Sequence, residues 1–153
     1  MKRISTIFLV LVTVSLAAPF VLGQMSRSGQ AAGILDGRLT PCPDKPNCVC
    51  SEYREDGEHF VEPLEFPLLA PGDVNAAVRG TIREMGGRIT TEREDYMAAT
   101  FHSPLFGFVD DLEIRIDAAA SLIHIRSASR VGYGDFGANR KRTEKFRKLF
   151  DQG

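Results

Sequence analysis

The sequence has neither an excess of positive charge nor an internal repeat. Its 153 residues carry 19 lysines and arginines against 20 aspartates and glutamates, a formal net charge of −1. Proteins that bind nucleic acids generally present a strongly basic surface, so we expect no nucleic-acid partner. Without a recurring period, a repeat architecture is not predicted either.

Charge is also missing near the N-terminus. Lys2 and Arg3 are followed by no charged residue between Ile4 and Ser26. A basic start and an apolar stretch are typical of an export signal. The apolar residues 4–22 also approach the length that spans a bilayer. We therefore interpret residues 1–23 as a signal peptide or a membrane anchor, and both alternatives stay open.

The charge pattern predicts where the rest of the chain lies. Basic residues before an apolar segment remain cytoplasmic, so we expect an exported, periplasmic or extracytoplasmic protein, tethered to the inner membrane if residues 4–22 are not removed. The membrane would then be a partner through this segment. Gln24 stands where a lipoprotein would need cysteine, so lipid attachment is not expected there.

Cysteine is scarce, with three residues in the chain. In an oxidising compartment, Cys42 and Cys48 are candidates for a disulfide that closes a short loop and leaves Cys50 over. The alternative is a thiol or metal-binding protein that uses all three cysteines. Their spacing matches no strong zinc pattern, so we predict neither a metal nor a cofactor.

The hydrophobic pattern predicts one small α+β domain over residues 39–153, after a flexible tether at 24–38. A loop rich in proline and cysteine comes first and discourages strand formation. A helix then begins near residue 71 with Asp73 as its N-cap, and a second helix covers 139–150. Four strand candidates lie between them, at 88–92, 96–101, 108–117 and 121–129. We expect an antiparallel four-stranded meander with both helices on one face.

The last two strands predict their own register. Apolar residues must share the core face, because a slip of one position would turn isoleucines toward water. The opposite face is expected to be wet, with a cross-strand ion pair between Glu113 and Arg126. The predicted pairs are Ile116 with Ile123, Ile114 with Ile125, Arg115 with His124, and Glu113 with Arg126.

The same alternation places Asp110 on the core side, about opposite Ser129. A buried carboxylate is costly unless it is satisfied. One hypothesis is that Asp110 accepts hydrogen bonds from nearby backbone or pairs with an arginine. The other is that Asp110 and Asp111 belong to a ligand or catalytic site, as in a small hydrolase-like enzyme that also uses His124 or Arg126.

Residues 132–137 have the G-x-G-x-x-G spacing between a strand and a helix. A dinucleotide fold would need a further strand and an acidic residue about twenty positions on, which this sequence does not provide. The glycines can instead supply positive φ for a turn. An alternative is a binding loop for an anionic group, flanked by Arg130 and Arg140.

The last predicted helix carries a basic face. Such a face is either solvated or lies on an anionic lipid or envelope polymer. Its basic residues are Arg140, Lys141, Arg142, Lys145, Arg147 and Lys148, against Glu144 alone.

Several stretches together resemble the uncharacterised family catalogued as domain of unknown function 1499. They lie at residues 42–49, 108–113 and 124–142, and the run from Ser127 to Gly132 is the most specific. The resemblance extends over residues 39–150 and implies a small exported or membrane-associated domain without an established activity. Cys50 departs from the family pattern, which more often has serine there.

The leading prediction is a non-enzymatic envelope module that binds an anionic group or a partner protein. An enzyme is the rival, but no nucleophile, base and orienting residue can be assigned together, and catalytic residues stay unknown. The candidate ligand-binding residues are Asp110, Asp111, Arg126, Ser129, Arg130, Gly132, Tyr133, Asn139 and Arg140.

Overall fold

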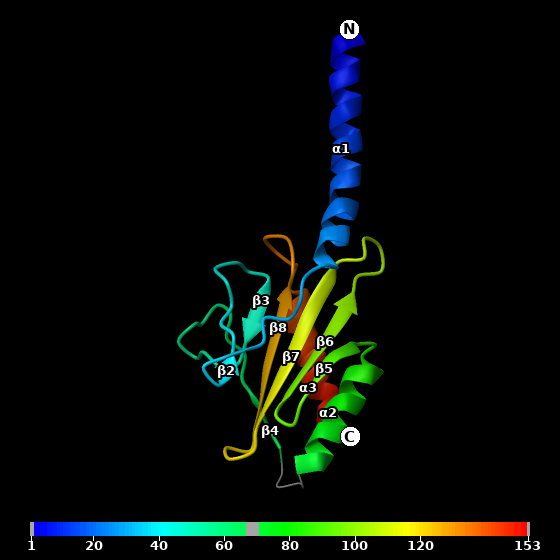
Figure 1. Cartoon of the computed structure of the whole chain (residues 1–153). Helices are drawn as coiled ribbons and strands as arrows, with labels where there is room; N and C mark the ends of the chain where they lie inside the picture. Colours follow the sequence, from blue (N-terminus) through cyan, green and yellow to red (C-terminus); the bar gives the residue numbers. More distant parts are fainter. Residues whose placement is uncertain (1, 67–70, 153) are drawn as a thin grey trace.

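The computed structural model describes residues 2–66 and 71–152. A long helix, α1, projects from one end of a sheet that carries two further helices (Figure 1). The helices are α1 (Lys2–Ser26), α2 (Pro71–Glu84) and α3 (Ala138–Phe150). The strands are β1 (Ile34–Leu35), β2 (Arg38–Leu39), β3 (Cys48–Cys50), β4 (Leu64–Glu65), β5 (Arg88–Glu92), β6 (Tyr96–His102), β7 (Val109–Asp117) and β8 (Leu122–Ser129).

The predicted α+β class is confirmed, but the predicted four-stranded sheet is too small. The main sheet has six strands in the order β3-β8-β7-β6-β5, and β4 also pairs with β8. Its strand pairs are antiparallel. The prolines around β3 were expected to discourage a strand, yet residues 48–50 contain none, so their backbone N–H groups remain free to pair.

The predicted register of β7 and β8 is confirmed at every position. Ile116 faces Ile123, and Glu113 faces Arg126. Asp110 lies opposite Ser129, as expected. The alternation of apolar side chains on one face is therefore sufficient to fix this pairing.

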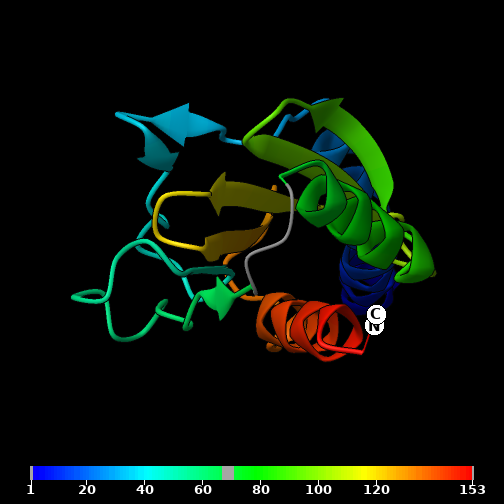
Figure 2. The same cartoon turned by 90° about the horizontal axis from the view of Figure 1, so that it is seen from below.

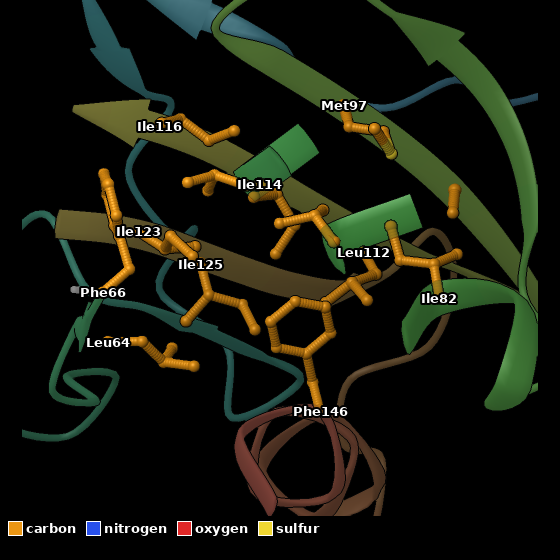
Figure 3. Close-up of a cluster of buried hydrophobic side chains, with 13 residues drawn as sticks. Leu64, Phe66, Ile82, Met97, Leu112, Ile114, Ile116, Ile123, Ile125 and Phe146 are labelled. Atoms are coloured by element: carbon orange, nitrogen blue, oxygen red, sulfur yellow. The ribbon is translucent and has the colours of Figure 1, made fainter. Parts of the chain in front are cut away.

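Both α2 and α3 cover the same face of the sheet, as Figure 2 shows from below. The buried stripe of α2, formed by Val74, Val78 and Ile82, joins Phe146 of α3 in one apolar cluster. Figure 3 shows Ile82 and Phe146 with the isoleucines of β7 and β8. The helix α2 begins at Pro71, so Asp73 lies in its first turn and the predicted N-cap position is wrong.

The opposite face of the sheet is covered, and the prediction of a wet face is wrong. The Glu113 side chain is fully buried and Arg126 is 5% exposed. Leu39 and Tyr96 form a second apolar cluster on this side. The backbone N–H of Gly33 donates to Glu113 Oε1 at 2.6 Å.

The covering segment is the one expected to be an unstructured tether. Residues 24–38 contain the end of α1, the strand β1 and the start of β2. Two of their backbone groups bond the sheet: the Gly33 N–H donates to Glu113 Oε1, and the Ser26 carbonyl oxygen accepts from Arg130 Nη1. A composition rich in glycine and serine therefore did not imply a free chain here.

The last turn of α1 contacts the domain directly. Gly23 packs on the backbone of Phe106 so closely that an added Cβ would lie 2.0 Å from its carbonyl oxygen. Ser26 Oγ accepts a hydrogen bond from the Val109 N–H at 2.9 Å. Over the part of the chain that the structure describes, no helix has both the length and the apolarity of a membrane span. Export of the chain stays a prediction.

Candidate functional site

The structure divides the candidate ligand-binding residues between the two faces of the sheet. Neighbouring residues of a strand point to opposite faces, so Asp110 lies on the helix side and Asp111 on the other. Ser129 and Asn139 lie on the same side as Asp110, whereas Arg130 bonds Asp111 on the other side. The catalytic hypothesis required the two aspartates to share one site. They lie on opposite faces of the sheet and do not.

Asn139 is the centre of the network on the helix side. It is fully buried at the start of α3. Its Nδ2, which carries two hydrogens, lies within hydrogen-bond distance of three acceptors: the carbonyl oxygen of Asn47 at 2.9 Å, Ser129 Oγ at 2.9 Å and Asp135 Oδ2 at 2.7 Å. Ser127 Oγ donates to its Oδ1 at 2.7 Å. One amide thus joins the disulfide loop, β8 and α3.

Arg142 completes this network. Its Nη2 donates to Asp110 Oδ2 at 2.7 Å, and its Nη1 donates to Ser127 Oγ at 2.9 Å and to Asn139 Oδ1. The guanidinium also lies over the ring of Phe101, 5.0 Å from its centroid. The hypothesis that Asp110 pairs with a nearby arginine is therefore supported. These groups satisfy one another and hold α3 on the sheet.

On the other face, Arg130 binds Asp111 through two parallel hydrogen bonds. Its Nε and Nη2 donate to the two carboxylate oxygens at 2.8 and 2.7 Å. Its Nη1 donates to the Ser26 carbonyl oxygen at 3.2 Å. This bidentate pair fixes the end of α1 relative to the sheet.

The predicted ion pair between Glu113 and Arg126 is present but buried. Arg126 Nη1 donates to Glu113 Oε2 at 2.6 Å, and the Tyr96 hydroxyl donates to Glu113 Oε1 at 2.8 Å. Burial raises the pKa of Tyr96, and the charge of Glu113 raises it further. Arg126 Nε has no hydrogen-bond partner among the described residues.

Glu52 gathers three basic side chains at the same face. Arg115 Nε donates to it at 2.7 Å, Arg38 Nε at 3.3 Å, and His124 Nδ1 lies 3.6 Å away. Burial alone would raise the pKa of Glu52, but the hydrogen bond from Arg115 and the charge of His124 lower it overall. Burial lowers the pKa of His124 despite the nearby carboxylate.

The remaining candidates do not converge with these groups. Arg140 donates to the carbonyl oxygens of Glu58 and Phe60 at 3.0 and 3.3 Å. Tyr133 is 72% exposed. Gly132 and Gly137 have φ values of 90° and 76°, so two of the three glycines serve the turn, as the structural hypothesis for this loop holds.

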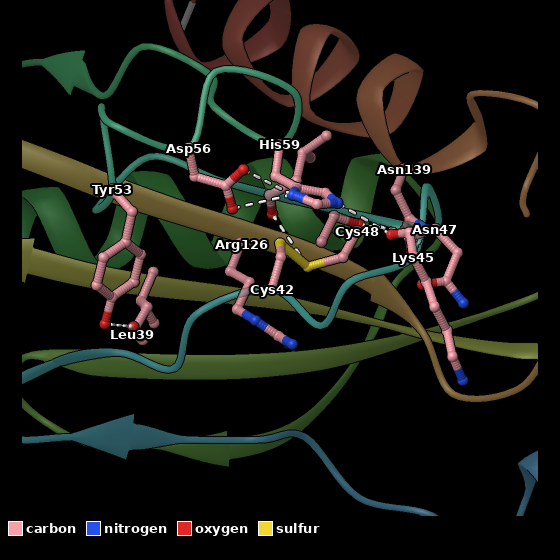
Figure 4. The surroundings of a disulfide bond; sticks show 12 residues. Leu39, Cys42, Lys45, Asn47, Cys48, Tyr53, Asp56, His59, Arg126 and Asn139 are labelled. Carbon is pink, nitrogen blue, oxygen red and sulfur yellow. Dashed lines mark hydrogen bonds and ion pairs between the residues drawn. A yellow bond between two sulfur atoms is a disulfide. The ribbon is translucent and has the colours of Figure 1, made fainter. Parts of the chain in front are cut away.

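The cysteines follow the disulfide prediction. Cys42 and Cys48 are bonded, and Cys50 is a buried free thiol. Figure 4 shows the bond beside His59, whose ring contacts Asp56 and the Lys45 carbonyl oxygen. With two thiols in a bond, the alternative of a site built from all three cysteines is wrong. Among the described residues, no group of acidic, histidine or cysteine side chains could hold a metal.

The basic face of α3 is smaller than its sequence indicates. Arg147 Nη1 donates to the carbonyl oxygen of Pro63 at 3.2 Å and its Nη2 to that of Glu62 at 2.5 Å. Arg140 and Arg142 are also engaged by groups of the domain. The three arginines therefore tie α3 to neighbouring segments.

A large open hollow lies on the outer face of the sheet, beside the segment that follows α1. Its volume is about 640 Å³. Basic and hydroxyl side chains line it, and no acidic side chain is among its lining residues. They include Arg27, Arg88, Arg93, Arg130, His102, Thr90, Thr91, Thr100 and Tyr96.

Three arginines of this hollow have no acidic partner. Arg27, Arg88 and Arg93 form no ion pair with any described residue. A register shift between Ile89 and Thr91 interrupts the pairing of β5 with β6. An extra residue in one strand breaks the alternation of side chains between the two faces of the sheet. Two consecutive residues, Thr90 and Thr91, therefore both line the hollow.

The hollow could not be predicted from the sequence. Of its four arginines, only Arg130 was a candidate residue. Tyr96, Thr100 and His102 alternate along one strand face, and that period is visible in the sequence. Arg27, which also lines the hollow, belongs to residues 24–38, the segment expected to be a flexible tether. No sequence feature therefore predicted that Arg27 would lie against the sheet.

Comparison with known proteins gives a family and no characterised relative. The family described as protein of unknown function (DUF1499) matches residues 38–150. No curated protein matches the chain.

Proposed function

The chain belongs to the DUF1499 family of proteins of unknown function, and on that premise we propose that it is a binding module for an anionic group. The binding site is the hollow lined by Arg27, Arg88, Arg93 and Arg130. The observation that carries the proposal is the gathering around one hollow of three arginines, Arg27, Arg88 and Arg93, that have no acidic partner among the described residues.

The charge balance of the chain makes this gathering informative. The chain as a whole has a formal net charge of −1, and most of its other arginines pair with a carboxylate or a backbone carbonyl oxygen. Arg126 and Arg142 are examples: Arg126 is bonded to the buried Glu113, and Arg142 to the partly buried Asp110. Unpaired guanidinium groups that converge leave their donors free for a ligand.

The neutral side chains of the hollow favour the same ligand class. Thr90 and Thr91 add hydroxyl groups beside the arginines. Arg93 lies over the ring of Tyr96, 4.8 Å from its centroid, and this contact orients its guanidinium. Phosphate and carboxylate groups accept hydrogen bonds from both kinds of donor.

The volume of the hollow favours a ligand larger than a single inorganic ion. At about 640 Å³, it lies in the range of ordinary small-molecule sites. Several anionic groups on one molecule, or a segment of an anionic polymer, would contact Arg27, Arg88 and Arg93 together, while Arg130 stays bonded to Asp111. The predicted envelope polymer is a ligand of this kind.

Calorimetric titration with inorganic tripolyphosphate and with citrate, at low ionic strength, tests the proposal. The double substitution R88Q/R93Q removes two guanidinium groups and should weaken binding of at least one probe by tenfold or more. The order of the two probes would indicate whether phosphoryl or carboxylate groups are preferred. The substitution R83Q is the matched control, because Arg83 is an exposed arginine of α2 outside the hollow.

Equal affinities for the wild type and R88Q/R93Q would overturn the proposal. So would a loss of binding free energy in R83Q that is half the loss in R88Q/R93Q, since an equal loss for each charge removed would reflect the net charge alone. Unchanged midpoints of urea unfolding would show that the variants are folded. The three substituted arginines are exposed, so little change in stability is expected.

A further inference from the structure

A second surface of the chain is apolar and lies where α1 leaves the domain. Along α1, the described apolar side chains are exposed on every side of the helix. They include Leu11, Val12, Val14, Phe20, Val21, Leu22 and Met25. A helix that is apolar all round is normally surrounded by protein or lipid.

Two loops of the domain flank the end of this helix. One joins β6 to β7, and the other joins β8 to α3. Figure 1 shows both at the end of the sheet from which α1 projects. Their tips carry Leu105, Tyr133 and Phe136, which are 72%, 72% and 101% exposed. The exposed side chains of these loop tips therefore extend the apolar surface of α1.

The helix and the loops also share one pocket. Its volume is about 460 Å³. Leu22 of α1, Leu105 and Phe106 of the first loop, and Val131 and Phe136 of the second all line it. Phe20 and Phe106 pack edge to face, with ring centroids 5.1 Å apart. The three segments therefore form one continuous apolar surface.

Phe136 provides a second, independent observation. Its φ is 55°, in the left-handed region that is unfavourable for residues with a Cβ. The fold thus holds a large apolar side chain fully exposed in a strained backbone conformation. Strain of this kind is often associated with function.

We propose that this end of the molecule docks on a lipid bilayer, with α1 and the tips of both loops entering it together. A flat apolar phase can receive a projecting helix and two loop tips on either side of its base. A protein partner would have to surround α1 on all sides and reach both loops. Arg27 lies where α1 ends, near Gly107, at the depth where lipid phosphates would neutralise it.

Apart from Arg27, which lines the hollow and also lies at the base of α1, the docking surface is separate from the arginine-lined hollow. It uses the loops of residues 103–108 and 131–137, whereas the hollow lies over β5 and β6. The proposal concerns contact with the bilayer and does not require that α1 cross it. Aromatic residues such as Tyr133 and Phe136 suit the interface between lipid and water.

Tryptophan fluorescence in the full chain tests the proposal, because the sequence contains no tryptophan. Each variant carries one: F136W at the loop tip, L11W on α1, and A119W as a matched control. Ala119 is exposed in the turn between β7 and β8, at the opposite end of the sheet in Figure 1. The variants are reconstituted with vesicles of equal parts phosphatidylcholine and phosphatidylglycerol, with brominated acyl chains as quencher.

The expected result is strong quenching and a blue shift for L11W and F136W, with A119W unchanged. Quenching of L11W without quenching of F136W would overturn the docking of the loops. Absence of quenching at both positions would overturn the proposal altogether. Equal quenching at all three positions would indicate non-specific adsorption and would also contradict it.

Discussion

Arg142 Nη2 donates to Asp110 Oδ2 at 2.7 Å, although 32 positions separate the two residues. The contact joins α3 to the start of β7 on the helix side of the sheet. Both side chains are largely buried, with 13% and 15% of their surfaces exposed. A long-range pair in this setting should contribute to the stability of the domain.

The substitution D110N tests that contribution. It keeps the shape of the side chain and removes its charge, so the free energy of unfolding should fall by about 1–3 kcal/mol. Urea denaturation of D110N, R142Q and the double variant gives the coupling between them. A coupling energy of zero would show that the two groups stabilise the fold independently, contrary to the prediction.

Asn139 allows a sharper test, because its substitution by aspartate changes one donor group into an acceptor. In N139D, oxygen would face the Asn47 carbonyl oxygen and the carboxylate of Asp135, which now accept from Nδ2. We expect a loss of more than about 2 kcal/mol at neutral pH, since buried acceptors would oppose one another. Acidification should protonate the new carboxylate and so reduce the difference in free energy of unfolding between N139D and the wild type. A difference that does not change with pH would contradict this account.

The chain's own periodicity predicted the part of this site that lies within β7 and β8. The alternation of isoleucines fixed the register, and the register placed Asp110 opposite Ser129. Asn139 and Arg130 were candidates before their contacts were known. Strand pairing is a local property of two adjacent segments, so sequence alone is informative about it.

The covering of the outer face could not be predicted in this way. Residues 27–39 have no apolar period, and they are attached by separate contacts such as the Gly33 N–H with Glu113 and the burial of Leu39. Glu113 and Arg126 were therefore expected in water, and they are buried. The arginine-lined hollow was missed for the same reason, since one of its walls comes from this segment.

The disulfide predicts a specific pattern of thiol reactivity. In the native protein one free thiol, that of Cys50, is present, and burial raises its pKa to about 11. It should therefore resist alkylation at pH 8 and react fully in denaturant, because the thiolate is the reactive form. Mass spectrometry after alkylation would report no modified cysteine in the native state and one after unfolding. Rapid native modification would contradict the burial of this thiol.

The bond between Cys42 and Cys48 also predicts a stability effect. It closes a short loop, with a sequence separation of 6. The chain-entropy estimate for such a loop is about 2 kcal/mol, and C42S/C48S should lose roughly this amount. The substitution C50S is the control for loss of a cysteine alone. If C42S/C48S and the wild type unfold at the same urea concentration, the disulfide contributes nothing to stability.

Two histidines predict opposite responses of stability to pH. Burial lowers the pKa of His59, but its contacts with Asp56 and the Lys45 carbonyl oxygen prevail and raise the pKa overall. Both ring nitrogens face acceptors, at 2.9 and 3.0 Å, which suits the protonated ring. Burial lowers the pKa of His124, so its neutral form is favoured in the folded state.

The linkage between proton binding and folding gives the sign of each effect. The contribution of His59 is fully present below the ordinary histidine value of 6.5 and is lost as pH rises through its raised pKa. The contribution of His124 is present above 6.5 and is lost as pH falls toward its lowered pKa. Urea unfolding of the variants H59N and H124N between pH 5 and pH 8 should therefore separate the two effects. In H59N the free energy of unfolding should no longer fall as pH rises, and in H124N it should fall less than in the wild type as pH decreases. The exposed His102 supplies the control H102N, and a wild-type profile in all three variants would contradict both assignments.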